Sequence, residues 1–196
     1  MADTIKELQE RIKRLEDENR RWMRLAGTNR LTDLPNSLMF YKVVLPGELR
    51  KYDKMSVSLA CLLIAPDKLG DVNQELGRAI GDQLIQEVAN FLKERIEEEE
   101  RLFHLDGANF AILMMGAAEG RAKRKATGIR LEFQEATLEA GEKEFPDLTC
   151  SIGLAMVEGV IEAAEVTETV DVLYREVSDR LYNAKKGGGN AIVGVI

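Results

Sequence analysis

The stretch from His104 to Met114 joins two apolar runs through Asp106-Gly107. An Asp-Gly pair between hydrophobic segments is the strongest short-range sequence signal for a two-residue hairpin turn. Such a turn can present catalytic groups, because functional side chains are often carried on loops held by a rigid scaffold. Here the turn is followed by Ala108 and Asn109, which supply neither a charge nor a good proton acceptor. The stretch therefore predicts a hairpin whose turn is suited to present catalytic groups but carries none.

Histidine and cysteine offer little further chemistry. His104 is the only histidine in the chain, which excludes any mechanism that needs two, and we interpret it as a half-buried strand residue. Cys61 and Cys150 lie in apolar strand-like runs without metal or redox spacing. We interpret both as buried small hydrophobic residues and expect a reducing, cytoplasmic setting.

The charge and hydropathy of the chain argue against two kinds of partner. The formal net charge of −7 disfavours a nucleic-acid surface, which needs clustered lysine and arginine. No apolar run approaches the roughly 20 residues that a membrane helix requires, so we expect no membrane association. The acidic run Glu97 to Glu100 and the basic positions between Arg121 and Arg130 are interpreted as solvated helix surface.

Residues 1–30 have the pattern of a dimerising helix. Ile5 and Ile12 with Asn19 occupy a positions of a heptad, and the d positions follow them at the alternating spacing of a coiled coil. Isoleucine at a with leucine at d favours a parallel pair, and an asparagine at a penalises other registers. The alternative is an amphipathic helix packed on its own domain. The predicted seam is Ile5, Leu8, Ile12, Leu15, Asn19 and Trp22.

Residues 31–196 alternate between strand and helix patterns. The pattern predicts an α/β (α+β) domain with a mixed, mostly antiparallel central sheet flanked by helices. Leu34-Pro35-Asn36 stops the first helix before this domain begins. The expected strands cover residues 56–65, 101–105, 109–115, 148–157 and 191–196, and the expected helices cover 71–76, 81–96, 117–140 and 170–185.

Five motifs follow one another along residues 31–196. They are "LTDLPN", the run from Asn73 through Gly77 to Gly81-Asp82, the signature "DGANF" (Asp106, Gly107, Ala108, Asn109 and Phe110), "TCSIG" and "LYNAKKGGGN". In their order and spacing they resemble the GGDEF domain, whose active members are diguanylate cyclases. The resemblance covers residues 31–196 and implies a nucleotide-cyclase-like palm fold behind a signalling coil. It also implies a role in bacterial cyclic di-GMP signalling.

The resemblance implies a reaction in which two metal ions, held by carboxylates, help one GTP attack another. In this sequence the first-strand carboxylate falls on Ala65, and the signature acids fall on Ala108 and Asn109. The nearby Asp67 cannot by itself hold two metals. The family's inhibitory product site aligns with Glu97 to Glu100, where four acids would repel a cyclic dinucleotide. We therefore predict no metal site, no catalytic residues and no enzymatic activity.

Three residues match nucleotide contacts of the resembled family. Asn73 and Asp82 match its guanine-recognising pair, and Lys185 matches a phosphate-binding lysine. An amide and a carboxylate suit the donors and acceptors of the guanine edge. The alternative is that Asp82 caps a helix after Gly81 and that Asn73 caps or turns the loop before it.

The predicted function is thus a catalytically inactive GGDEF-like module that dimerises through its coil and presents a surface to an unknown protein partner. The first alternative is a guanine-nucleotide sensor that binds GTP or GDP weakly, without a two-metal site. The second is a weakly active cyclase that borrows acids from a neighbouring subunit. No cofactor is expected. The sequence names neither the partner nor any domain ahead of the coil.

Overall fold

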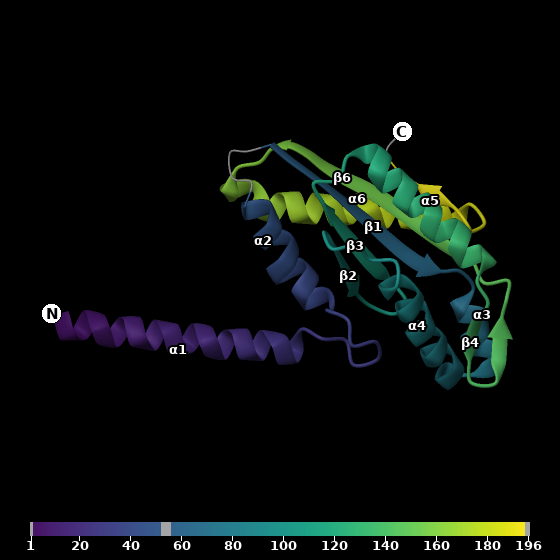
Figure 1. The fold of residues 1–196 in the computed structure, drawn as a ribbon, viewed down its shortest axis with the longest axis horizontal. Helices are drawn as coiled ribbons and strands as arrows, with labels where there is room; N and C mark the ends of the chain where they lie inside the picture. Colours follow the sequence, from purple (N-terminus) through teal and green to yellow (C-terminus); the bar gives the residue numbers. More distant parts are fainter. Residues whose placement is uncertain (1, 52–55, 195–196) are drawn as a thin grey trace.

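A five-stranded sheet with helices on both faces forms the body of the protein (Figure 1). The computed structural model describes residues 2–51 and 56–194. The strand order is β2-β3-β1-β6-β7, and every pair is antiparallel except β6 with β7. The predicted mixed, mostly antiparallel sheet is confirmed. The strands are β1 (Ser56–Pro66), β2 (Glu100–His104), β3 (Phe110–Met115), β6 (Cys150–Val160) and β7 (Ile192–Val193).

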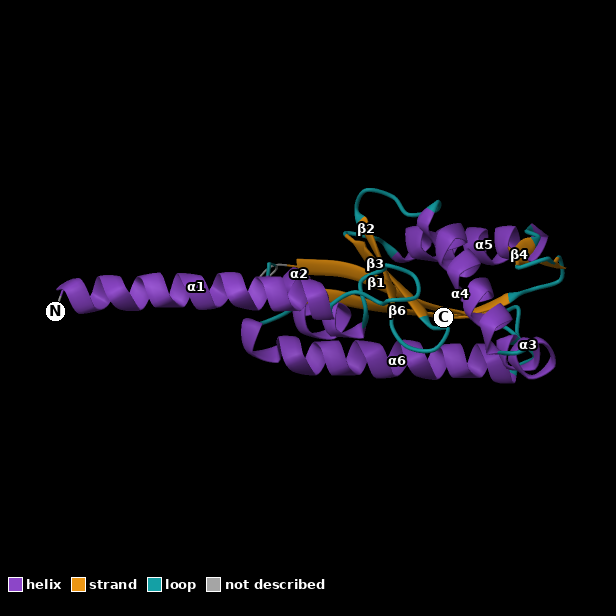
Figure 2. Ribbon diagram, turned by 90° about the horizontal axis from the view of Figure 1, so that it is seen from below, coloured by secondary structure: helices purple, strands orange, loops and turns teal. Residues whose placement is uncertain are grey.

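Side chains of the central strand β1 alternate between two cores, as the two-residue period of a strand requires. Ala60, Leu62 and Ile64 face α4 (Arg78–Lys93) and α5 (Glu119–Glu135). Leu59, Cys61 and Leu63 face α6 (Val166–Lys186) and α2 (Leu45–Arg50). Figure 2 shows α6 below the sheet, with α4 and α5 above it. Because both faces are covered, β1 reads as a continuous apolar run.

The predicted buried environment of both cysteines is confirmed. Cys61 and Cys150 are buried free thiols on the central strands. Burial raises the pKa of each thiol to about 12, since the thiolate would lose its hydration. Both are therefore poor nucleophiles near neutral pH.

Two short stretches differ from the predicted elements. A π-helix (Met39–Val44) runs into α2, in a stretch for which no element was predicted, and buries Phe40 against Phe103 of β2. The helix predicted to continue to residue 140 ends at Glu135, and a hairpin of β4 (Leu138–Ala140) and β5 (Lys143–Phe145) follows. Strands of three residues are too short to display a two-residue period, so neither strand could be predicted.

The remaining helices agree with the prediction in type and differ at their ends. α3 (Leu69–Leu76) and α4 begin earlier than expected, and a 3₁₀ turn (Ala163–Glu165) extends the start of α6. The last strand covers only Ile192–Val193, and the final two residues of its predicted range lie outside the described residues. None of the described helices is long and apolar enough to cross a membrane.

The N-terminal helix α1 (Ala2–Ala26) projects away from the body (Figures 1 and 2). It makes no substantial packing contact with the described elements of the domain. Its apolar seam is exposed, with Ile5, Leu8, Ile12 and Leu15 at 55–57% and Trp22 at 69%. The alternative prediction of a helix packed on its own domain is therefore wrong.

Candidate functional site

The signature residues form the tip of the β2–β3 hairpin, beside the end of β1. The backbone N–H of Asn109 donates to the Asp106 carbonyl at 2.9 Å, so the turn is centred on Gly107 and Ala108. Gly107 has a φ of +55°, which glycine adopts without strain. The predicted hairpin is present, but the predicted two-residue turn on Asp106-Gly107 is wrong. The loop spans Leu105 to Asn109 because the strands stop pairing at His104 and Phe110.

The acids nearest to the signature turn are committed to hydrogen bonds within the protein. Asp106 accepts a bond from the Asn109 amide at 3.0 Å. Asp67, which is 8% exposed, accepts bonds from Thr149 Oγ1 and Ser151 Oγ, both at 2.7 Å, and from the Asn190 backbone N–H at 2.8 Å. Asp67 thereby joins the end of β1 to the start of β6 and to the loop after α6.

The residues at this site do not fit the pair of metal ions that the family implies. Ala65 and Ala108 carry methyl groups where carboxylates would be needed, and the oxygens of Asp67 are already occupied. Across residues 2–51 and 56–194, no group of three or more histidine, cysteine, aspartate or glutamate residues is placed to hold a metal ion. Hard divalent cations need several oxygen ligands at once.

Asn73 lies against Gly81, the residue before Asp82, across the junction of α3 and α4. An ideal Cβ added to Gly81 would lie 1.9 Å from Asn73 Oδ1, so the amide rests directly on the backbone beside Asp82. Asp82 is exposed on the second turn of α4, whose N-cap is Gly77 with a φ of +85°. The interpretation of Asp82 and Asn73 as capping residues is therefore wrong. Within the described residues, neither side chain makes a hydrogen bond, which leaves both available to a ligand.

Lys185 is exposed in the last turn of α6, and the loop after it closes on Asp67. A Cβ on Gly189 would lie 2.9 Å from Asp67 Cγ, so no larger residue could replace Gly189 without a shift. The residue after Asp67, Lys68, is the N-cap of α3. The structure thus brings Lys185 to the same end of the sheet as α3, the helix that carries Asn73.

His104 connects the signature turn to the segment between α1 and the domain. Its Nε2 donates to the Gly107 carbonyl at 2.8 Å, which leaves Nδ1 to accept from Thr32 Oγ1 at 3.0 Å. The ring stacks on Phe110 and is 2% exposed. We call residues 27–36 the connecting turn. The bond between Thr32 and His104 was missed, because no sequence signal pairs residues 72 positions apart.

Burial lowers the pKa of His104 below its ordinary value, since the imidazolium loses hydration. The unfolded chain then binds a proton more readily than the native one, so acid favours unfolding. We expect the free energy of unfolding to fall between about pH 7.5 and 5.5, and to fall less in His104→Gln. Urea titrations at both pH values test this. Equal losses in the two proteins would contradict it, and the chain has no second histidine to confuse the result.

The acidic run before β2 is not the solvated helix end that was predicted. α4 ends at Lys93, and Glu100 is 2% exposed at the start of β2. Lys125 Nζ lies 2.7 Å from Glu100 Oε2, and Arg121 pairs with Glu97 at 3.0 Å. Arg121 and Lys125 hold the pKa of the exposed Glu97 carboxyl below its ordinary value. Both basic side chains are therefore engaged by acids of the run and not merely solvated.

Comparison with known proteins identifies the class of protein. The family model "Diguanylate cyclase, GGDEF domain" matches residues 26–191, so the chain belongs to the GGDEF family. Diguanylate cyclase DosC of Escherichia coli K12 is 26% identical over 167 residues, which cover 85% of this chain and 35% of the relative. Diguanylate cyclase TpbB of Pseudomonas aeruginosa is 26% identical over 182 residues, which cover 93% and 40%. The chain thus spans well under half the length of these relatives.

Solved structures share the fold. The coiled coil and GGDEF domain of DgcB from Caulobacter crescentus, in complex with c-di-GMP, superposes with a TM-score of 0.75 at 20% identity and covers 97% of both chains. The FimX GGDEF domain from Pseudomonas aeruginosa gives 0.75 at 17% identity, over 86% of this chain and 99% of that one. The resemblance inferred from the five motifs is confirmed.

These comparisons correct one prediction. The chain was expected not to be an enzyme, but the family is that of the diguanylate cyclases and the relatives are named as such. The prediction took the replacement of three acids as sufficient to abolish enzymatic activity. The match to the family model of diguanylate cyclases extends along 166 positions, residues 26–191, in spite of these replacements.

Proposed function

We propose that this chain acts as a dimeric GGDEF module in cyclic di-GMP signalling, with two copies paired through α1. The observation that carries the proposal is the exposed seam of α1. Four aliphatic side chains and Trp22 lie more than half exposed along one face of a helix that stands clear of its domain. Such a stripe in heptad spacing is buried when a second helix packs against it. Asn19 at an a position favours a parallel, in-register pair.

The contacts of the connecting turn support a signalling role for this helix. Asn36 Nδ2 donates to the carbonyl of Ala26, the last residue of α1, at 2.7 Å. Lys93 of α4 donates to the Thr32 carbonyl at 2.8 Å. Thr32 in turn bonds His104, which bonds Gly107 in the signature turn. A rotation of α1 would thus act on the signature turn through a short series of hydrogen bonds.

A protein partner is part of the proposal. The structure of diguanylate cyclase SiaD in complex with its activator SiaC, from Pseudomonas aeruginosa, superposes with a TM-score of 0.72 at 19% identity, over 98% of this chain and 71% of SiaD. A partner protein that binds the connecting turn or α1 would change the position of the signature turn through the same hydrogen bonds.

The register of the pair is tested by cross-linking. In a parallel pair, Asn19→Cys brings two thiols face to face at an a position, so we expect a disulfide-linked dimer under mild oxidation. Glu10→Cys is the matched control, since position 10 lies on the opposite side of the helix and should link poorly. Cys61 and Cys150 are buried and should not react. Equal linking of the two variants would contradict the proposed register.

A second candidate function is guanine-nucleotide binding at Asn73, Asp82 and Lys185. The specific observation is that the Asn73 amide lies against Gly81, the residue before the exposed Asp82, and that neither side chain has a hydrogen-bond partner among the described residues. The carboxylate can accept from N1–H and the exocyclic amine of guanine, as no other common base allows. Lys185 would supply a cation for the phosphates.

Calorimetry tests this site. We expect GTP and GDP to bind more tightly than ATP, and Asp82→Ala to weaken GTP binding by at least about tenfold, since a charged hydrogen-bonding partner is lost. Asp179→Ala removes an exposed carboxylate elsewhere and should leave binding unchanged. Absence of heat with every guanine nucleotide would remove the candidate.

A further inference from the structure

One edge of the central sheet is open along half of a long strand. β6 runs from Cys150 to Val160 and pairs with β1 along its whole length. On its other side, β7 pairs only with Ile152 and Gly153. Within the described part of the chain, no strand covers Ala155–Val160 on that side. Open edges present unpaired backbone groups to any extended segment.

The direction of the backbone groups on this edge follows from two contacts. The Ile152 N–H bonds the Ala191 carbonyl, toward β7, and the Leu154 carbonyl faces the same way, where it accepts from the Arg180 guanidinium. Successive residues of a strand point their N–H and C=O groups to opposite sides. The N–H and C=O groups of Met156 and Glu158 therefore face the open edge.

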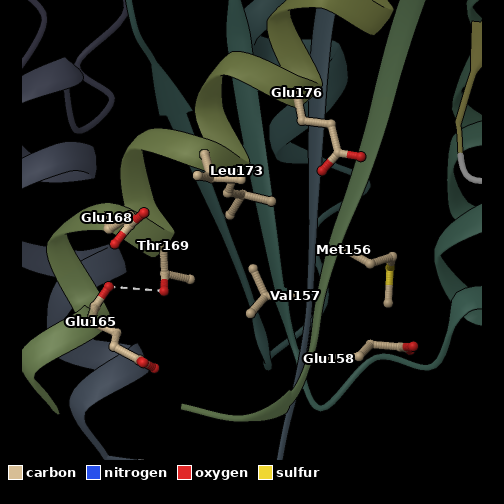
Figure 3. A pocket seen from close by; sticks show the side chains of 9 residues that line it. Met156, Val157, Glu158, Glu165, Glu168, Thr169, Leu173 and Glu176 are labelled. Carbon is tan, nitrogen blue, oxygen red and sulfur yellow. Dashed lines mark hydrogen bonds between the residues drawn. The ribbon is translucent and has the colours of Figure 1, made fainter. Parts of the chain in front are cut away.

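A hollow of about 450 Å³ lies beside this edge, between β6 and the N-terminal half of α6. Figure 3 shows Met156, Val157 and Glu158 on the strand, opposite Thr169 and Leu173 on the helix. Val172, at the same hollow, is 42% exposed. The hollow thus offers apolar surface next to unpaired backbone groups, which is the combination that strand addition uses.

The charge around the hollow is one-sided. Four glutamates line it and no lysine or arginine does: Glu158, Glu165, Glu168 and Glu176. Glu176 pairs with Arg180, and Glu165 accepts from the Glu162 N–H in a capping box. Among the described residues, Glu158 and Glu168 have no ion-pair partner. Their uncompensated charge favours a basic occupant.

We propose that the open edge of β6 is a docking site for an extended, basic segment of a partner protein, which pairs as a strand with the part of β6 that β7 leaves uncovered. Its backbone bonds Met156 and Glu158, its alternate small apolar side chains contact Val157 and Val172, and its lysines or arginines are attracted by the four glutamates. This site lies apart from the signature turn and from the nucleotide-contacting residues.

The test uses the full chain and a short fluorescein-labelled peptide of alternating lysine and valine. Anisotropy should report binding that weakens with salt, whereas a peptide of alternating glutamate and valine should not bind. Glu158→Lys with Glu168→Lys should weaken binding by at least about tenfold, because two attractions become repulsions. The control is the double variant Glu135→Lys with Glu144→Lys, which changes the net charge by the same amount at exposed positions away from the hollow. It should preserve binding.

Two measurements separate strand addition from simple charge attraction. Two peptides are compared, one N-methylated at its odd-numbered residues and the other at its even-numbered residues. Only one of these two sets of amides faces β6 in a paired strand, so one peptide should lose binding and the other should keep it. The Met156 and Glu158 amides should also become protected from hydrogen exchange in the complex. Binding that ignores both N-methylation patterns, or that leaves these two amides unprotected, would overturn the proposal, as would equal binding of the acidic peptide.

Discussion

Asp67→Ala is expected to lower the free energy of unfolding by about 4 kcal/mol, because a buried carboxylate that accepts three hydrogen bonds is lost. Thr149, Ser151 and the Asn190 backbone would each lose their acceptor at once. The bonds join the end of β1 to β6 and to the loop after α6, so no single element can relax to replace them. Urea denaturation followed by circular dichroism measures the change.

Two further variants sharpen this prediction. Asp67→Asn keeps the shape and one acceptor oxygen, and its amide can donate to a hydroxyl, so we expect about half the loss. Asp179→Ala removes an exposed carboxylate from the middle of α6 and should change stability by less than about 0.5 kcal/mol. If Asp67→Ala lowered the free energy of unfolding by no more than Asp179→Ala does, the structural role assigned to Asp67 would be wrong.

The second large expected effect is a gain of metal binding when carboxylates are restored at two positions where the family has metal ligands. Ala65→Asp combined with Ala108→Glu should raise the affinity for Mn²⁺ by at least about a hundredfold over the parent chain, because carboxylates return to two of the family's metal positions. β1 and β3 pair up to Ile64 and Phe110, so residue 65 lies beside the signature turn. Calorimetry with Mn²⁺ measures the gain. A higher rate of cyclic di-GMP formation from GTP than in the parent is the expected functional readout.

Stability provides an independent check on this variant. Ala65 is fully buried among apolar side chains, so an aspartate there is costly until a cation neutralises it. Mn²⁺ should therefore raise the melting temperature of the double variant and leave the parent unchanged. The neutral pair Ala65→Asn with Ala108→Gln is the control. Equal Mn²⁺ affinity in the acidic and neutral variants would mean that the pocket also differs in shape, for example through Pro66.

The sequence predicted what depends on local periodicity. The long apolar run of β1, the amphipathic face of α4 and the seam of α1 each carry their signal within one element, and each is present as expected. The π-helix at Met39–Val44 and the β4–β5 hairpin were missed, since the helix covers less than two turns and each strand of the hairpin has only three residues.

The site was less predictable because its contacts link distant residues. The alignment of Asn73 and Asp82 with a nucleotide site was available from motif spacing, but the packing of Asn73 against Gly81 depends on how α3 meets α4. The hydrogen bonds of Asp67 reach residues more than 80 positions away, and the sequence offered only its position after Pro66. The open edge of β6 follows from the shortness of β7, which was predicted to be longer.

Light scattering on the purified chain, with and without residues 1–27, tests most directly whether α1 pairs two GGDEF domains. We predict twice the mass of the 21.9 kDa chain for the full sequence and a single copy for the chain that begins at Thr28. A full-length monomer, or a shortened chain that still dimerises, would contradict the pairing through α1.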